Sequence, residues 1–281
     1  MSTNYSEVVD VARSYYNSDD ADNFYFRVWG GEDIHIGLYE NDDEPISIAS
    51  ERTVAAMADQ ITQSIVGARV VDLGAGYGGS ARWLTRNLSC HVTCVNLSEV
   101  QNRRNRAMNR AARLGERIDV LDASFENVPL PDSTFDIAWS QDSFLHSGDR
   151  ARVLAEVNRI LRPGGEFIFT DPMQADDCPP GSLQPVLDRL QLDSLAAPGY
   201  YRDQANAHGW TELGFTDLTL QLVAHYTRVR QELAVRRDEL LDSVSGAYID
   251  RMIAGLGHWI DAGDGGLLRW GIFHLRKPAR D

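Results

Sequence analysis

The feature of this sequence that most limits its possible folds is an alternation of strand-like and helix-like segments. Apolar, strand-like runs occupy residues 68–74, 91–97, 118–125, 135–141 and, after a turn, the segment 162–172. Patterns with helical spacing occupy residues 77–88, 98–115 and 149–161. Alternation of this length indicates right-handed crossovers and a parallel sheet. We therefore predict a doubly wound, Rossmann-like α/β domain.

The flanking segments are less regular. Residues 1–50 mix aromatic and acidic side chains and predict short helices and loops that form an N-terminal lid, and a helix is expected over residues 47–65. After the sheet core we expect helices over 179–196 and 199–210, a strand over 215–223, long helices over 225–263 and a last strand over 267–277. The predicted organisation is a lid, residues 1–50, and one domain, residues 51–281, with cap helices around 174–200 and 225–262.

Composition narrows the classes of function. With 281 residues the chain suits one large domain, and its formal net charge of -14 would repel nucleic acid and anionic membranes. Its apolar runs are shorter than the roughly 20 residues of a membrane span, and the N-terminus lacks the pattern of an export signal. Three cysteines offer neither a disulfide framework nor a zinc site, so we expect a cytoplasmic protein without a metal.

The stretch VVDLGAGYGG places Gly74, Gly76 and Gly79 in a G-x-G-x-x-G pattern directly after a predicted strand. This pattern is typical of NAD or flavin binding, where it normally opens the domain and the next strand usually ends in an acid. Here it begins some seventy residues into the chain, Asp72 precedes the turn, and the next strand ends at Asn96. With the later strand-end landmarks, the stretch resembles the first motif of class I S-adenosylmethionine methyltransferases, so a dinucleotide oxidoreductase is only a minor alternative.

The resemblance implies that S-adenosylmethionine is the cofactor. A carboxylate suits its cationic sulfonium and amino groups, and Asp72 would supply that charge near the turn. Asn96 stands where the family usually carries an acid for the ribose hydroxyls, and its amide can still donate and accept hydrogen bonds. Asp122 and Ala123 match the adenine-binding position. The complete predicted set is Asp72, Gly74, Ala75, Gly76, Asn96, Leu97, Gln101, Asp122, Ala123, Ser124 and Gln141.

The acceptor is indicated by an ordered set of motifs: YFRVWGGEDIHIGLY, WSQDSFLHS, TDPM, QPVLDRL, GLGHWIDAG and LLRWG. Together they closely resemble sarcosine/dimethylglycine N-methyltransferases over nearly the whole chain, within a group that includes phosphoethanolamine methyltransferases. The resemblance implies methyl transfer to sarcosine and dimethylglycine, with glycine betaine as the product and a small amino acid as the partner. Methylation of another small amine and S-adenosylmethionine binding without catalysis are the alternatives, and the oligomeric state stays open.

An amino-acid acceptor needs an anion binder for its carboxylate, aromatic faces for its methylated ammonium and a group that takes or orients the amine proton. Asp142 and His146 follow the fourth predicted strand and match the Asp and His that contact the amine in the related phosphoethanolamine methyltransferases. By position Tyr16 would pair with His146, and its rivals are Tyr15 and Tyr25. The sequence offers further residues for the carboxylate and for an aromatic cage: Arg189 as first choice, Arg269 as second, and Trp29, Trp139, Tyr201, Trp259 and Trp270.

Overall fold

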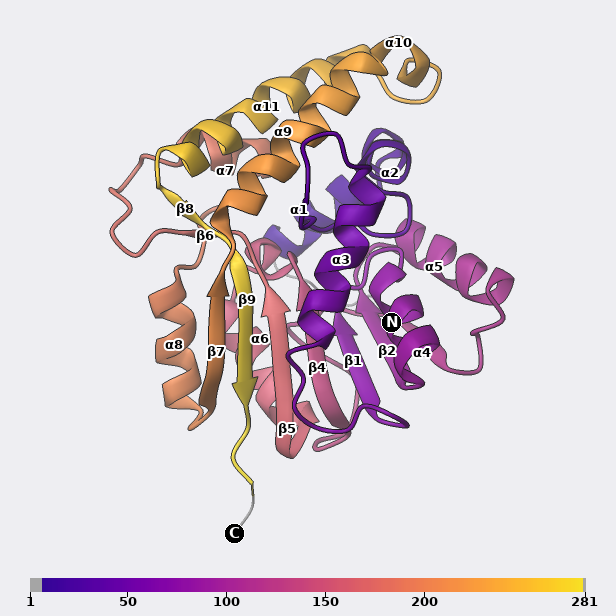
Figure 1. Cartoon of the computed structure of the whole chain (residues 1–281), viewed down its shortest axis with the longest axis vertical. Coiled ribbons are helices and arrows are strands. Elements are labelled where there is room, and N and C mark those ends of the chain that lie inside the picture. Colours follow the sequence, from indigo (N-terminus) through magenta and orange to yellow (C-terminus); the bar gives the residue numbers. More distant parts are fainter. Residues whose placement is uncertain (1–6, 280–281) are drawn as a thin grey trace.

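A computed structural model of the chain describes residues 7–279, in which one seven-stranded sheet forms the centre (Figure 1). The strand order is β3-β2-β1-β4-β5-β9-β7. The strands are β1 (Arg69–Leu73), β2 (His91–Asn96), β3 (Ile118–Asp122), β4 (Phe135–Gln141), β5 (Leu161–Thr170), β7 (Thr211–Asp217) and β9 (Gly271–Arg276). The predicted doubly wound class is confirmed, and β1 to β5 are parallel neighbours.

The C-terminal part of the sheet differs from the sequence prediction. β9 pairs antiparallel with both β5 and β7, so the sheet is mixed, not wholly parallel. The strand predicted over 215–223 is wrong in its second half. The Asp217 carboxylate accepts from the Thr219 amide and hydroxyl, which turns the chain out of the strand, and a helix begins at Thr219. The strand predicted over 267–277 is interrupted at Trp270, and its first part, β8 (Leu268–Arg269), pairs instead with β6 (Met173–Gln174).

Helices cover both faces of the sheet. One face packs against α3 (Ile46–Ala58) and α4 (Gly79–Leu88), and the other packs against α6 (Arg150–Ile160) and α8 (Pro198–Ala207). The spacing of α6 explains its packing, because Val153, Val157 and Ile160 share one apolar stripe and are buried. Each face of the sheet therefore has its own apolar core.

A third apolar cluster lies over the carboxyl ends of the strands and joins distant parts of the chain (Figure 1). The cap comprises α7 (Gln184–Leu190), α9 (Thr219–Val235), α10 (Arg237–Leu240) and α11 (Gly246–Asp264). The N-terminal part comprises α1 (Glu7–Tyr16), α2 (Asp19–Phe24) and the π-helical turn η1 (Tyr25–Trp29). Lid and cap share this core, and a domain boundary at residue 50 stays a prediction.

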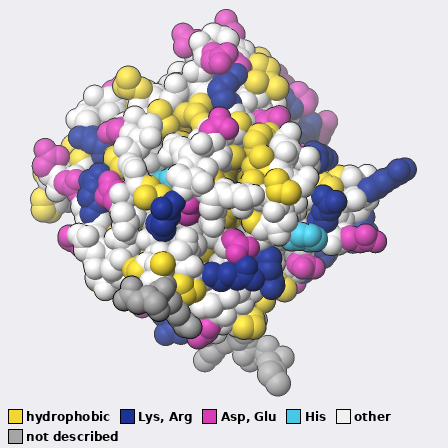
Figure 2. All heavy atoms as spheres, turned by 60° about the horizontal axis from the view of Figure 1, so that its bottom comes forward, with side chains coloured by type: hydrophobic (Ala, Val, Ile, Leu, Met, Phe, Trp, Pro, Cys, Tyr) yellow, Lys and Arg dark blue, Asp and Glu magenta, His cyan; other side chains and the backbone are white. Residues whose placement is uncertain are grey.

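Two of the four arginines of helix α5 (Glu99–Ala111) form ion pairs within the molecule. Arg104 pairs with Asp22 of the lid at 2.6 Å, and Arg106 pairs with Asp122. On the face that Figure 2 displays, Lys and Arg side chains are intermixed with Asp and Glu. Among residues 7–279, no helix has the length and apolar character that would let it cross a membrane.

Candidate active site

The glycine-rich turn after β1 is shaped by close contacts. Gly74 has φ +81°, and a Cβ there would collide with the Ser143 side chain. Gly79 opens α4, where its amide donates to the Glu32 carbonyl at 3.2 Å and a Cβ would collide with the Asp33 carboxylate. The lid thus covers the helix N-terminus at which a dinucleotide would place its pyrophosphate. This arrangement disfavours the oxidoreductase alternative.

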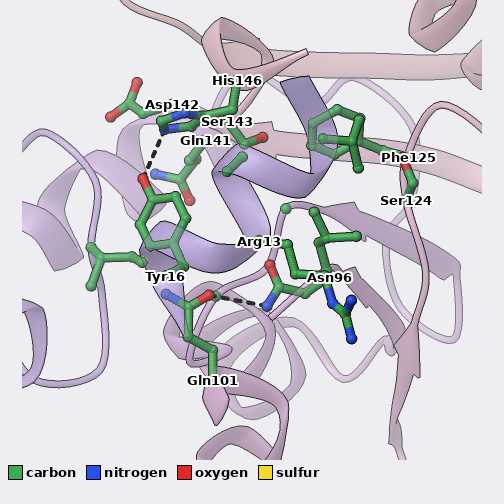
Figure 3. A pocket seen from close by; sticks show the side chains of 16 residues that line it. Arg13, Tyr16, Asn96, Gln101, Ser124, Phe125, Gln141, Asp142, Ser143 and His146 are labelled. Atoms are coloured by element: carbon green, nitrogen blue, oxygen red, sulfur yellow. Dashed lines mark hydrogen bonds between the residues drawn. The ribbon is translucent and has the colours of Figure 1, made fainter. Parts of the chain in front are cut away.

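A cavity that we call the glycine-side cavity opens beside this turn (Figure 3). It is lined by Val9, Ala12, Arg13, Tyr16, Ile34, Gly74, Gly76, Asn96, Leu97, Gln101, Ser124, Phe125, Gln141, Asp142, Ser143 and His146. Seven of the eleven predicted cofactor residues are among them. Six of them come from the ends of β1, β2, β3 and β4, the edge at which ligands of open α/β sheets bind, and Gln101 comes from the helix after β2.

Two amides in the glycine-side cavity are held in fixed orientations. The Gln141 Oε1 accepts from the Ser80 hydroxyl at 2.5 Å and from the Trp139 indole at 2.9 Å. Its Nε2 is buried and has no partner among the described residues, so it is available to a ligand acceptor. The Asn96 Nδ2 donates to Gln101 at 3.1 Å. Amide groups of this kind fit the uncharged ribose and adenine of S-adenosylmethionine.

Four predicted cofactor residues line neither this cavity nor the one described next: Asp72, Ala75, Asp122 and Ala123. The Asp122 carboxylate instead accepts from Asn102 and pairs with Arg106. Asp72 is buried below the turn, and this burial raises its pKa to about 7. The structure therefore gives these side chains supporting positions, and direct cofactor contact by them stays a prediction.

A second cavity, the arginine-side cavity, adjoins the first. Its lining comprises Tyr16, Tyr25, Trp29, Ile34, His35, Ile36, Asp142, Leu145, His146, Pro172, Arg189, Leu190 and Tyr226. Four residues line both cavities: Tyr16, Ile34, Asp142 and His146. The predicted catalytic trio is thus brought together at the junction of the two cavities.

Arg189 reaches the arginine-side cavity from α7 and is unusual in its surroundings. Its Nε and Nη1 atoms are buried without a hydrogen-bond partner among residues 7–279. The guanidinium carbon lies 5.5 Å from the centre of the Tyr226 ring and 5.9 Å from that of Trp259. Because an unpaired buried cation is costly, this site favours an anionic ligand.

The second-choice arginine is not brought to either cavity. The Arg269 Nη1 donates to the carbonyls of Gly266 and Leu268, which lie in its own turn. Its proposed carboxylate role is therefore unsupported by its position. Of the predicted cage aromatics Trp29 lines the arginine-side cavity, whereas the others do not: Trp139, Tyr201, Trp259 and Trp270.

Asp142 is held rigidly at the junction. It has φ +50° directly after β4, and its amide donates to the Thr170 carbonyl at 2.9 Å. One carboxylate oxygen accepts from the Ile36 amide and the other from the Trp270 indole, each at 2.7 Å. These donors stabilise the carboxylate, while burial raises the pKa of Asp142.

His146 pairs with the lid. Its Nε2 lies 2.7 Å from the Tyr16 hydroxyl (Figure 3), whereas the Tyr15 hydroxyl lies 3.0 Å from that of Tyr248 and 3.2 Å from that of Tyr25. Tyr16 is therefore the lid tyrosine that meets His146. Burial, with Arg150 and Arg189 nearby, lowers the pKa of His146 to about 3, so its ring is neutral at physiological pH.

Several lining residues were missed by sequence reasoning. Ser143 and Phe125 directly follow predicted site residues, so adjacency was an available signal. Most of the others come from the N-terminal segment or from the cap helices, among them Ile34, His35, Ile36 and Tyr226. No periodic pattern distinguishes them.

The position of Asn96 supports one prediction. Asn96→Asp should tighten S-adenosylhomocysteine binding if the side chain meets the ribose, because a charge-assisted hydrogen bond is roughly twice as strong as a neutral one. Desolvation of the carboxylate limits this gain. Isothermal titration of the variant measures it, with Asn87→Asp, on an exposed part of α4, as control. Unchanged affinity for both S-adenosylhomocysteine and adenosine would place Asn96 outside the site.

Comparisons with known proteins agree with this geometry. Residues 71–169 match the family model described as a methyltransferase domain. Sarcosine/dimethylglycine N-methyltransferase of Halorhodospira halochloris is 54% identical over 278 residues, which are 99% of this chain and 100% of the relative. Dimethylglycine N-methyltransferase of Parasynechococcus marenigrum is 53% identical over 98% of this chain and 99% of the relative.

A solved structure agrees as well. A protein of Galdieria sulphuraria, determined as a candidate sarcosine dimethylglycine methyltransferase, superposes with a TM-score of 0.89 and 41% identity. The match covers 95% of this chain and 100% of that one. With the shared fold and the site at the carboxyl ends of the strands, these similarities show that the chain belongs to the sarcosine/dimethylglycine N-methyltransferase family, whose cofactor is S-adenosylmethionine.

Proposed function

We propose that this enzyme transfers methyl groups from S-adenosylmethionine to the nitrogen of sarcosine and dimethylglycine, and so forms glycine betaine. The observation that carries the proposal is the Arg189 guanidinium in the arginine-side cavity, whose Nε and Nη1 atoms are buried and unpaired among the described residues. A carboxylate matches a guanidinium in charge and in planar geometry. The name of one relative described above specifies both acceptors, and the name of the other specifies dimethylglycine.

The arginine-side cavity offers complementary groups to both ends of such a zwitterion. Arg189 would bind the carboxylate, and Asp142, at the junction, would face the ammonium. Tyr25, Trp29 and Tyr226 supply aromatic rings along the same cavity, and such rings attract methylated ammonium groups. In this arrangement the acceptor nitrogen points toward the glycine-side cavity.

S-adenosylmethionine supplies the methyl group on a cationic sulfur. Positive charge moves from sulfur to nitrogen in the transfer, so no oxyanion has to be stabilised. The protein acts chiefly by holding the nitrogen in line with the methyl group in a cavity that excludes water. The neutral His146 and Tyr16 would orient the amine at the junction.

A phosphobase acceptor is the main alternative. Its phosphate is larger and more highly charged than a carboxylate, whereas among the described residues Arg189 is the single Lys or Arg side chain that lines the arginine-side cavity. Mass spectrometry of products from glycine, sarcosine and dimethylglycine tests the proposal and counts the methyl groups added. Isothermal titration against dimethylglycine and phosphoethanolamine completes the test, and tight binding of the phosphobase alone would overturn the proposal.

We further propose that the enzyme works in the cytoplasm on a small-molecule partner, without nucleic acid or a membrane. Its three cysteines are free thiols, as suits a reducing compartment. The net charge of -14 opposes binding to polyanions. An acidic surface would also suit a cell that accumulates glycine betaine.

A further inference from the structure

Two histidines line the arginine-side cavity, and the charges around them have opposite signs. His146 lies near Arg150 and Arg189, and its Nε2 meets the Tyr16 hydroxyl. His35 lies near acids: its Nε2 is 3.2 Å from the Asp33 carboxylate, and the Ile36 amide that follows it donates to Asp142. A proton arriving in the cavity is therefore stabilised at His35 and opposed at His146.

Methyl transfer to an amine requires a group that accepts the amine proton. This inference therefore rests on the proposed function. Aliphatic ammonium groups such as that of lysine have a pKa of about 10, so the acceptor amine is protonated in neutral solution. Its N–H bond must break before the lone pair can form the new N–C bond, while the electrons of the S–C bond stay on sulfur. Each transfer to sarcosine or dimethylglycine thus releases one proton.

We propose that His35, paired with Asp33, accepts this proton from the amine nitrogen of the acceptor. The Nδ1 of His35 lies 3.4 Å from the Ile36 carbonyl, to which it can donate. The Nε2 is buried, lies 3.2 Å from the Asp33 carboxylate and has no hydrogen-bond partner among the described residues, so its lone pair is available to take up a proton. The negative charge of Asp33 then stabilises the protonated ring. The surroundings of His35 are therefore built for the protonated ring.

The other titratable groups around His35 also favour its protonated form. Asp142, which is half-buried, approaches from the end of β4, and the buried Asp72 approaches from β1. From α9, His225 lies near His35, and its Nδ1 accepts from the Gly37 amide at 3.1 Å, so that nitrogen carries a lone pair. Burial lowers the pKa of His35, but Asp33 and Asp142 raise it, and the net pKa is raised.

Asp33 also provides a way out for the proton. His35 is 5% exposed, whereas the side chain of Asp33 is 14% exposed and lies against the start of α4. The proton taken up by the imidazole can pass to solvent beside Asp33 without crossing the glycine-side cavity. His35 and Asp33 can thus remove the proton of the methyl acceptor while S-adenosylmethionine is bound.

The test is the pH dependence of kcat for dimethylglycine at saturating S-adenosylmethionine. Loss of a general base typically costs about a hundredfold to ten-thousandfold, so His35→Gln should lose at least about a hundredfold at pH 7. Its rate should then rise about tenfold per pH unit toward the amine pKa of about 10, because only amine already deprotonated in solution can react. Added imidazole should restore part of the activity of His35→Ala.

Asp33→Asn and His146→Gln are the matched variants. In Asp33→Asn the pKa of His35 falls, because the carboxylate is lost. The acidic limb of the pH profile of kcat should therefore lie at lower pH than in the wild type, and the plateau value of kcat should be lower. His146→Gln should lower kcat equally at every pH. Thermal melting and S-adenosylhomocysteine titration report whether each variant is folded.

The outcomes separate this inference from the proposed function. A wild-type enzyme that methylates neither sarcosine nor dimethylglycine contradicts the proposed function, whatever the His35 variants do. An active wild type whose His35→Gln variant keeps its rate, or loses it equally at all pH values, overturns the role of His35. An unmoved acidic limb in folded Asp33→Asn overturns the pairing with Asp33.

Discussion

Arg189→Ala should nearly abolish the use of dimethylglycine while S-adenosylmethionine affinity stays close to wild type. Its Nε and Nη1 atoms are buried and unpaired within residues 7–279, and the side chain lines the arginine-side cavity but not the glycine-side cavity. Loss of a buried charged partner typically costs about 2 to 5 kcal/mol, or roughly thirtyfold to several thousandfold in affinity. Isothermal titration with dimethylglycine, followed by steady-state kinetics, measures the loss.

Two further variants sharpen this prediction. Arg189→Lys keeps the charge but not the planar pair of donors, so it should raise KM for dimethylglycine by less than the alanine variant. Arg269→Ala is the control, since that guanidinium binds its own turn. A neutral analogue without the carboxylate should bind wild type and Arg189→Ala alike. Equal dimethylglycine affinity in both proteins would contradict an amino-acid acceptor held by Arg189.

His146→Ala should lower kcat about a hundredfold and change S-adenosylhomocysteine affinity much less. The neutral ring orients groups at the junction through its 2.7 Å contact with Tyr16, and misplacement of reacting groups by about 1 Å can cost a hundredfold. Because its pKa is about 3, the ring stays neutral above roughly pH 4, so the loss should be the same from pH 6 to 9. Single-turnover rates across this range measure it.

Tyr16→Phe removes only the hydroxyl that meets His146 and should reproduce part of the loss. His91→Ala replaces an exposed histidine at the start of β2 and should leave kcat unchanged. If His146→Ala turns over at the wild-type rate, His146 has a structural role. If its loss grows as the pH falls, the ring itself exchanges a proton and the orienting role is wrong.

The sequence predicted those site residues whose places follow from strand ends. Asn96 is the last residue of a parallel strand, and Asp142 directly follows another. Parallel strands bring such positions to one edge of the sheet. The same reasoning failed for Asp122, because its carboxylate turns to Arg106 and Asn102, which no strand pattern reveals. A strand end locates the backbone, but a nearby charge decides where the side chain points.

The lid and cap were harder to predict. His35 and Tyr226 come from an irregular segment and from a long helix, and they meet only because residues about 190 positions apart pack in one apolar cluster. The antiparallel direction of β9 could not be predicted either, because side chains alternate with the same period in parallel and antiparallel strands. Arg189 was found because its motif resembled that of the family, whereas its burial became evident only in the folded chain.

The junction between the two cavities also makes their ligands thermodynamically interdependent. Tyr16 and Ile34 belong to the N-terminal segment and form part of the wall of both cavities. A ligand that orders this segment over one cavity lowers the entropic cost of ordering it over the other. S-adenosylhomocysteine should therefore tighten dimethylglycine binding, and dimethylglycine must tighten S-adenosylhomocysteine by the same factor, because such coupling is reciprocal. The shared wall thus turns two binding sites into one cooperative unit.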